Sequence, residues 1–183
     1  MNILNILRLA GWSLVAILLV LPAIAMYFGA EGVLWTPSDF VVAAILLGGT
    51  GLLIEITVRI SHNWAFRGGM AMGILTSLLL IWMNLAVGLI GNEENVANLM
   101  YLVVLALGPV GGLFARFAAR RMSQLMIAAA LCQVAIGIIA LALDFTDHVP
   151  SALFLNGAFA VLWLIAAGLF HNATAAHNSQ ANV

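Results

Sequence analysis

Six apolar segments of about 20 residues, separated by short polar stretches, dominate the sequence. A helix rises about 1.5 Å per residue, so about 20 residues match a hydrocarbon core roughly 30 Å thick. The segments lack strand-like alternation and are much longer than the ~10-residue strands of a membrane β-barrel. The pattern predicts an all-α integral membrane protein, a six-transmembrane-helix bundle. Its helices are expected at about residues 9–29, 40–60, 69–90, 97–115, 122–143 and 151–170.

Composition supports the membrane assignment. Hydrophobic residues make up 64% of the chain and charged residues 7%, whereas a soluble domain has about 25% charged residues. The net charge of −1 gives no electrostatic basis for binding nucleic acid. We therefore expect the lipid bilayer as the main partner, one transmembrane domain at 1–171, and a disordered, polar cytoplasmic tail at 172–183.

If the six apolar segments each cross the membrane, the basic and the acidic residues fall on opposite sides of it. Every basic residue falls on the side of the N-terminus, and six of the seven acids fall on the opposite side. This distribution follows the positive-inside rule and predicts that both termini lie in the cytoplasm. The basic residues are Arg8, Arg59, Arg67, Arg116, Arg120 and Arg121, and the acids opposite them are Glu31, Asp39, Glu93, Glu94, Asp144 and Asp147.

Two features concern the first two helices. Arg8, the apolar run 9–20 and the Ala23-Ile24-Ala25 triplet also fit a secretory signal with its cleavage site. Apolar residues continue as far as Phe28, which favours a retained first helix. For the second helix, Ser38 or Asp39 is the expected N-cap.

Glu55 is the one ionisable residue placed well inside a span. A carboxylate within a membrane is costly and is a candidate ligand for a proton or a cation. The alternative is structural, because Arg59 follows one helical turn later and can form an i,i+4 ion pair with Glu55.

Uncharged polar residues mark three other spans. Asn84, with Trp82 beside it, lies in the third helix, Gln133 in the fifth and Asn156 in the sixth. A cluster of amides at membrane depth can bind a small polar solute. It can equally join helices, since interhelical hydrogen bonds in membranes average about 0.6 kcal/mol. Both interpretations remain open on sequence alone.

Catalytic and metal-binding patterns are missing from the sequence. Asp144, Asp147 and His148, with Glu93 and Glu94, carry carboxylate and imidazole groups that suit a divalent ion, but their spacing matches no known loop motif and fits solvated loops better. No set of acid, base, nucleophile and metal ligands can be assembled. A membrane enzyme is therefore the third of three candidate functions, after the two non-catalytic ones given below, and the sequence does not identify a cofactor.

The polar hinge after the third predicted helix is similar in sequence to a known group of proteins. Together with Trp35-Thr36, Trp82 to Gly88 and Leu155-Asn156-Gly157, the hinge resembles a group of small, uncharacterised bacterial multi-pass inner-membrane proteins. This chain has Val96 where that group usually has proline. The resemblance implies a bacterial inner membrane and carries over no catalytic residue. The hinge residues concerned are Gly91-Asn92-Glu93 and Asn95-x-Ala97-Asn98-Leu99-Met100-Tyr101.

Glycines around Gly48 and Gly108 are expected to break the second and fourth helices, as in many transporters. With the membrane-depth amides, they suggest binding or permeation of a small solute through a polar bundle interior, at Glu55, Trp82, Asn84, Gln133 and Asn156. The alternative is a non-catalytic accessory or scaffold subunit that packs against a membrane-complex partner or another copy of the chain.

Overall fold

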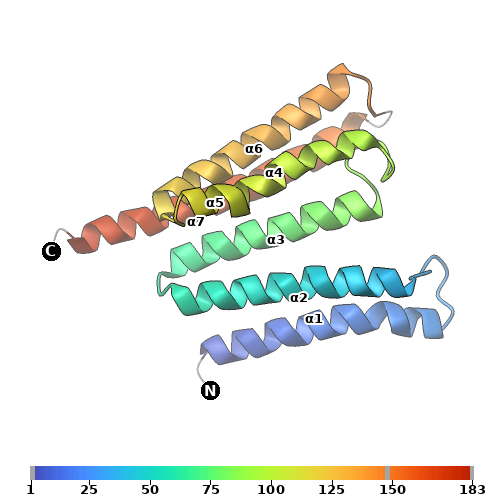
Figure 1. Cartoon of the computed structure of the whole chain (residues 1–183), viewed down its shortest axis with the longest axis horizontal. Helices are drawn as coiled ribbons and strands as arrows, with labels where there is room; N and C mark the ends of the chain where they lie inside the picture. The colour runs from blue at the N-terminus through green and yellow to red at the C-terminus, as the bar shows by residue number, and fades with distance from the viewer. Residues whose placement is uncertain (1–2, 147–148, 182–183) are drawn as a thin grey trace. The chain divides into compact units, whose positions relative to one another are not determined.

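The computed structural model describes residues 3–146 and 149–181, with side chains as far as residue 175. Within these ranges the chain is helical and has no strand, and six helices are long and apolar enough to cross a bilayer (Figure 1). The all-α prediction and its six long apolar helices are therefore confirmed. The elements are α1 (Ile3–Tyr27), α2 (Pro37–Ile60), α3 (Trp64–Ala86), η1 (Val96–Met100), α4 (Tyr101–Ala106), η2 (Leu107–Gly111), α5 (Gly112–Phe114), α6 (Ala119–Ala142) and α7 (Val149–Ala181).

The chain divides into two compact units, residues 1–60 and 61–183. The first unit is the antiparallel hairpin of α1 and α2 (Figure 1). Trp12 packs on Gly51, where an added Cβ would lie 3.3 Å from the indole ring. One helical turn from this contact on both helices, Arg8 forms an ion pair with Glu55. Gly51 therefore permits close approach of the two helices.

The start of α2 differs from the expected cap. Thr36, not Ser38 or Asp39, precedes the helix, with Pro37 in the first position, where the missing N–H of proline is harmless. The Asp39 carboxylate accepts hydrogen bonds from the backbone N–H of Thr36 at 2.7 Å and from its hydroxyl at 2.8 Å. Asp39 therefore reaches back to the residue before the helix, as in a capping box. Beyond this cap α2 continues as regular helix through Gly48–Gly51, so the expected break is absent.

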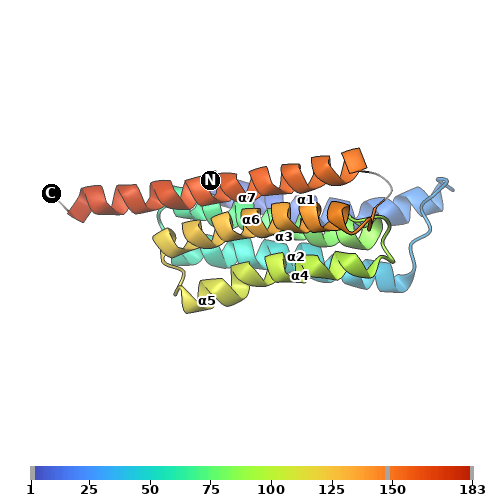
Figure 2. The ribbon, with the colours of Figure 1, turned by 90° about the horizontal axis from the view of Figure 1, so that it is seen from above.

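In the second unit, α7 contacts both α3 and α6, and α4 packs against α6 (Figure 2). Small residues permit these contacts: an added Cβ at Gly69 would lie 3.0 Å from the Phe170 ring, and one at Gly137 would lie 3.1 Å from Asn156. The buried apolar core of this unit runs along the same helices. Small residues at helix crossings are the expected packing device in lipid.

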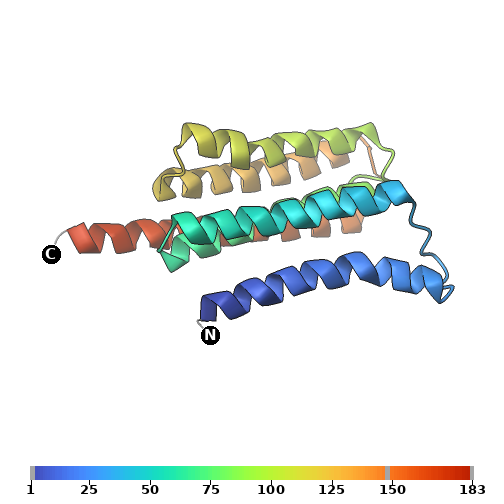
Figure 3. The ribbon, with the colours of Figure 1, turned by 60° about the horizontal axis from the view of Figure 1, so that its bottom comes forward.

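The fourth apolar segment is a composite rod, Val96–Phe114, that runs beside α6 (Figure 3). It starts as a 3₁₀ turn, continues as α-helix, and widens to a π turn at η2. Pro109 lies in that turn and lacks a backbone N–H to donate, which explains why the regular ladder is interrupted there. The break expected near Gly108 is thus present in this segment.

Several helix boundaries differ from the sequence-based expectation. α1 begins at Ile3 rather than near residue 9, and α3 begins at Trp64 rather than near residue 69. The third helix ends at Ala86 rather than near residue 90, and residues 87–95 form a loop. The last helix does not stop at 170 before a disordered tail but continues to Ala181, projecting beyond the adjacent end of α6 (Figure 2).

Candidate functional site

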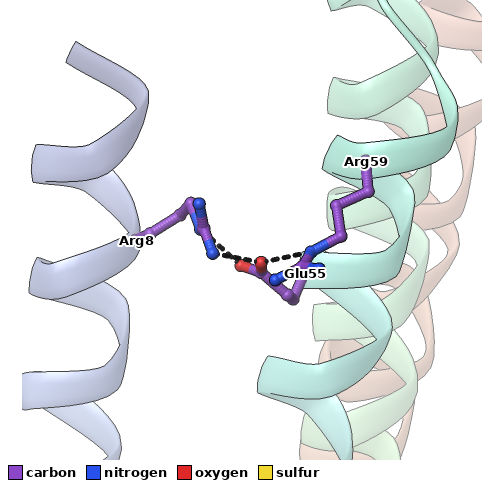
Figure 4. A network of polar contacts seen from close by, with 3 residues as sticks. All are labelled: Arg8, Glu55 and Arg59. Atoms are coloured by element: carbon purple, nitrogen blue, oxygen red, sulfur yellow. Dashed lines mark hydrogen bonds and ion pairs between the residues drawn. The ribbon is translucent and has the colours of Figure 1, made fainter. Parts of the chain in front are cut away.

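Glu55 lies on α2 with only 9% of its surface exposed. The Nε of Arg59 donates a hydrogen bond to Glu55 Oε1 at 2.7 Å, and the Nε of Arg8 donates one to Oε2 at 2.7 Å (Figure 4). A second nitrogen of Arg8 contacts Oε1. Both carboxylate oxygens are therefore held by guanidinium groups, and a cation could reach Glu55 only by displacing an arginine. The Arg59 pair was one of the two sequence-based alternatives, whereas the Arg8 pair depends on helix register and was missed.

Asn156 is the centre of a buried polar network in the second unit. Its Oδ1 accepts hydrogen bonds from the Tyr101 hydroxyl at 2.9 Å and from Gln133 Nε2 at 3.1 Å, while its Nδ2 donates to the Ala152 carbonyl at 2.9 Å. Tyr101, Gln133 and Asn156 are all buried and come from α4, α6 and α7. The network thus joins three helices. Sequence analysis named two of its members and missed Tyr101, although a phenol inside an apolar span needs a hydrogen-bond partner.

Asn84 is placed differently from the other two amides. Its Nδ2 donates to the Leu80 carbonyl of its own helix at 2.8 Å, but its buried Oδ1 has no partner among the described residues. A buried acceptor left without a donor is unfavourable by about 1–3 kcal/mol. Asn84 therefore offers an unused acceptor, which a bound molecule could satisfy.

Asn84 lines a pocket of about 360 Å³ between the hinge end of α3 and the start of the composite rod, with its Oδ1 buried behind the pocket surface. Half of the residues around the pocket are aliphatic and most of the others are polar hinge residues. Tyr101 connects the pocket with the buried network, since it lines the one and bonds within the other. The lining residues are Ile81, Asn84, Leu85, Glu93, Glu94, Asn95, Val96, Asn98, Leu99, Tyr101, Leu102 and Leu105.

Asparagines fix the hinge beside the pocket. Asn98 is buried, and its Oδ1 accepts from the backbone N–H groups of Leu89 and Ile90 at 3.1 and 2.9 Å. Its Nδ2 donates to the Asn92 carbonyl at 2.7 Å. Asn95 caps η1 through the N–H of Ala97 and donates to the Phe145 carbonyl, each at 2.9 Å. The hinge is therefore a built loop rather than a loose connection.

Glu93 and Glu94 lie on this fixed loop, at the pocket. Both are exposed, and neither forms an ion pair with a described residue. The pocket thus places two carboxylates and the side chain of Asn84, whose buried Oδ1 has no donor among the described residues, beside apolar walls. Such an arrangement suits a molecule with a cationic or donor-rich head and an apolar body.

Trp82 is half-buried on α3 and is not part of the pocket lining. It therefore stands beside the site rather than in it. Of the five residues predicted from sequence, Asn84 is at the pocket, Gln133 and Asn156 lie in the network that Tyr101 links to it, and Glu55 belongs to the first unit.

The acidic loops do not assemble a metal centre in the described part of the chain, where no group of three or more His, Cys, Asp or Glu residues could hold an ion. Asp147 and His148, which the sequence placed among candidate ligands, lie outside the described residues. Comparison with protein-family models, curated proteins and solved structures found no match to this chain. Its function therefore has to be argued from the pocket and the residues around it.

Proposed function

We propose that the chain is a multi-pass protein of the bacterial inner membrane, with both termini in the cytoplasm, that binds a small amphipathic solute in the pocket between α3 and the composite rod. The observation that carries the proposal is that Asn84 lines the pocket and that its buried Oδ1 has no donor among the described residues. A ligand with an N–H donor or a positive charge would satisfy this oxygen and be attracted by Glu93 and Glu94.

The polar contacts favour binding at this pocket over passage through a polar interior. Gln133 and Asn156 bond to each other, and Glu55 is occupied by two arginines. These side chains would have to exchange partners before they could serve a permeating solute. Gln133 Oε1 and Asn84 Oδ1 are both buried without a partner among the described residues, but only Asn84 is also a residue of the pocket lining.

The test uses the full chain in lipid nanodiscs and 2-phenylethylammonium as a probe with an apolar body and an N–H-donating cationic head, with binding measured by isothermal titration calorimetry. We expect saturable binding that weakens about five- to tenfold in Asn84→Ala, as for loss of one buried hydrogen bond. Glu94→Gln should weaken binding about two- to fivefold, because an exposed charge contributes little.

Glu31→Gln is the matched control for the carboxylate, since Glu31 is an exposed acid of the first unit. It should leave the affinity unchanged. If the wild-type chain does not bind the probe, or if Asn84→Ala binds it as tightly as Glu31→Gln does, the assignment of the pocket is wrong.

The second candidate, an accessory or scaffold subunit, is favoured by the buried network in which Tyr101 and Gln133 both donate to Asn156. Such a network stabilises helix packing and leaves the outer surfaces for a partner. Native-detergent purification separates the two candidates when it is combined with the binding experiment. A stoichiometric partner together with no probe binding would favour the subunit.

A further inference from the structure

The turn between α5 and α6 joins two apolar spans, Val96–Phe114 and Ala119–Ala142. The chain reverses there within a few residues: Phe117 N donates to the Gly112 carbonyl at 2.9 Å and Ala118 N to the Ala115 carbonyl at 3.1 Å. A turn this short between two membrane spans has to lie at the membrane surface. It also keeps Arg116 close in the chain to the first turn of α6.

Three of the six arginines have no ion-pair partner among the described residues. Arg8 and Arg59 share the carboxylate of Glu55. Arg67 is buried, donates to the Ser61 carbonyl at 2.6 Å and lies over the Trp64 ring at 5.1 Å. The remaining three are exposed and form no ion pair with any described residue. We call them the arginine turn: Arg116, Arg120 and Arg121.

The surroundings of the arginine turn favour an anion. Arg120 and Arg121 lie in the first turn of α6, which contains no acidic residue and has no side-chain cap at Ala118. The helix dipole is positive at this end, so it opposes two further positive charges there. Phe114 is 82% exposed beside them, and aromatic side chains are favoured at the membrane interface.

We propose that the arginine turn binds the phosphate of an anionic phospholipid headgroup at the membrane surface. Guanidinium groups match phosphate oxygens with paired N–H donors, and three unpaired guanidinium groups within six residues supply the complementary charge. A lipid occupant is favoured over a soluble anion because Phe114 places an exposed apolar ring against the acyl region that such a lipid brings with it.

The experiment compares lipid retention by the full chain, using native mass spectrometry after reconstitution in mixed phosphatidylcholine and phosphatidylglycerol nanodiscs. The wild-type chain should retain phosphatidylglycerol in preference to phosphatidylcholine. Arg120→Gln and Arg121→Gln should each reduce that preference about fivefold, the factor to which about 1 kcal/mol per surface arginine corresponds. Arg120→Lys should keep only part of it, because the charge remains but the paired N–H donors of the guanidinium group are lost.

Arg59→Gln is the matched control, since it removes one positive charge that Glu55 already balances. It should leave the preference within twofold of wild type, and so should the pocket variant Asn84→Ala. The proposal is overturned if Arg120→Gln and Arg59→Gln behave alike, or if wild type retains both lipids equally. It is also overturned if millimolar inorganic phosphate displaces phosphatidylglycerol completely, because the site would then take a free anion.

Discussion

Gly88 shows how one residue shapes the hinge. Its φ of 71° lies in the left-handed region, and a Cβ added there would come within 2.2 Å of the Asn92 carbonyl oxygen. Any residue other than glycine would be strained by this backbone conformation, and its side chain would collide with the Asn92 carbonyl group. The loop that presents Glu93 and Glu94 therefore depends on the absence of a side chain at residue 88.

We expect Gly88→Ala to destabilise the chain by at least about 1–2 kcal/mol, the cost of the left-handed conformation for an L-residue, with the backbone contact adding to it. The measurement is an unfolding titration with SDS in mixed micelles. Gly157→Ala is the control: Gly157 lies within α7 and an added Cβ meets nothing within 4 Å. Alanine should be neutral or stabilise there by up to about 1 kcal/mol. Equal effects of the two variants would contradict this view of the hinge.

At the scale of elements, one buried network connects three helices. Tyr101 and Gln133 both donate to Asn156 Oδ1, so α4, α6 and α7 meet at one acceptor. Single hydrogen bonds of this kind contribute modestly in membranes, because the separated helices also find partners. The network should therefore fix the register of the helices more than it adds to their stability.

Tyr101→Phe should lower stability by about 0.6 kcal/mol and by no more than about 1.7 kcal/mol. Combined with Asn156→Ala in a double-mutant cycle, it should show a coupling energy of the same size. Ser77→Ala is the control, because the Ser77 hydroxyl donates to the Gly73 carbonyl of its own helix. Zero coupling between Tyr101 and Asn156 would mean that the bond seen here does not hold the helices together.

The helices could be predicted because long apolar segments are diagnostic of membrane spans, but some ends could not. Leu89 and Ile90 extend the apolar run of α3, yet they belong to the loop and are buried. Their N–H groups bond to Asn98 instead of to a preceding helical turn. Gly88 is the local signal that marks this helix end, since glycine is favoured in the left-handed position just after a helix, but the apolar residues on both sides of it made the span look continuous.

The candidate site was predictable only in part for a related reason. Polar residues in apolar spans were visible in the sequence, so Asn84, Gln133 and Asn156 were named. Their partners follow from helix register and from which helices are neighbours, which the sequence does not specify. Arg8 beside Glu55, Tyr101 beside Asn156 and the pocket itself all depend on that tertiary information.

For the whole molecule, the polar ends of the composite rod have opposite charge. The hinge before the rod carries Glu93 and Glu94. The chain after the rod carries the three residues of the arginine turn. The rod has 19 residues, roughly 28 Å at 1.5 Å per residue, which matches a hydrocarbon core. Under the positive-inside rule the arginine end stays in the cytoplasm and the hinge faces the opposite compartment.

Cysteine labelling tests this orientation without removing any charge. In a Cys132→Ser background, Asn92→Cys places a thiol on the exposed hinge and Ala118→Cys places one on the exposed arginine turn. A membrane-impermeant maleimide should label Asn92→Cys in spheroplasts and Ala118→Cys only after the membrane is permeabilised. Labelling of both from one side would contradict the topology. If both thiols reacted only after permeabilisation, the hinge and the pocket beside it would face the cytoplasm.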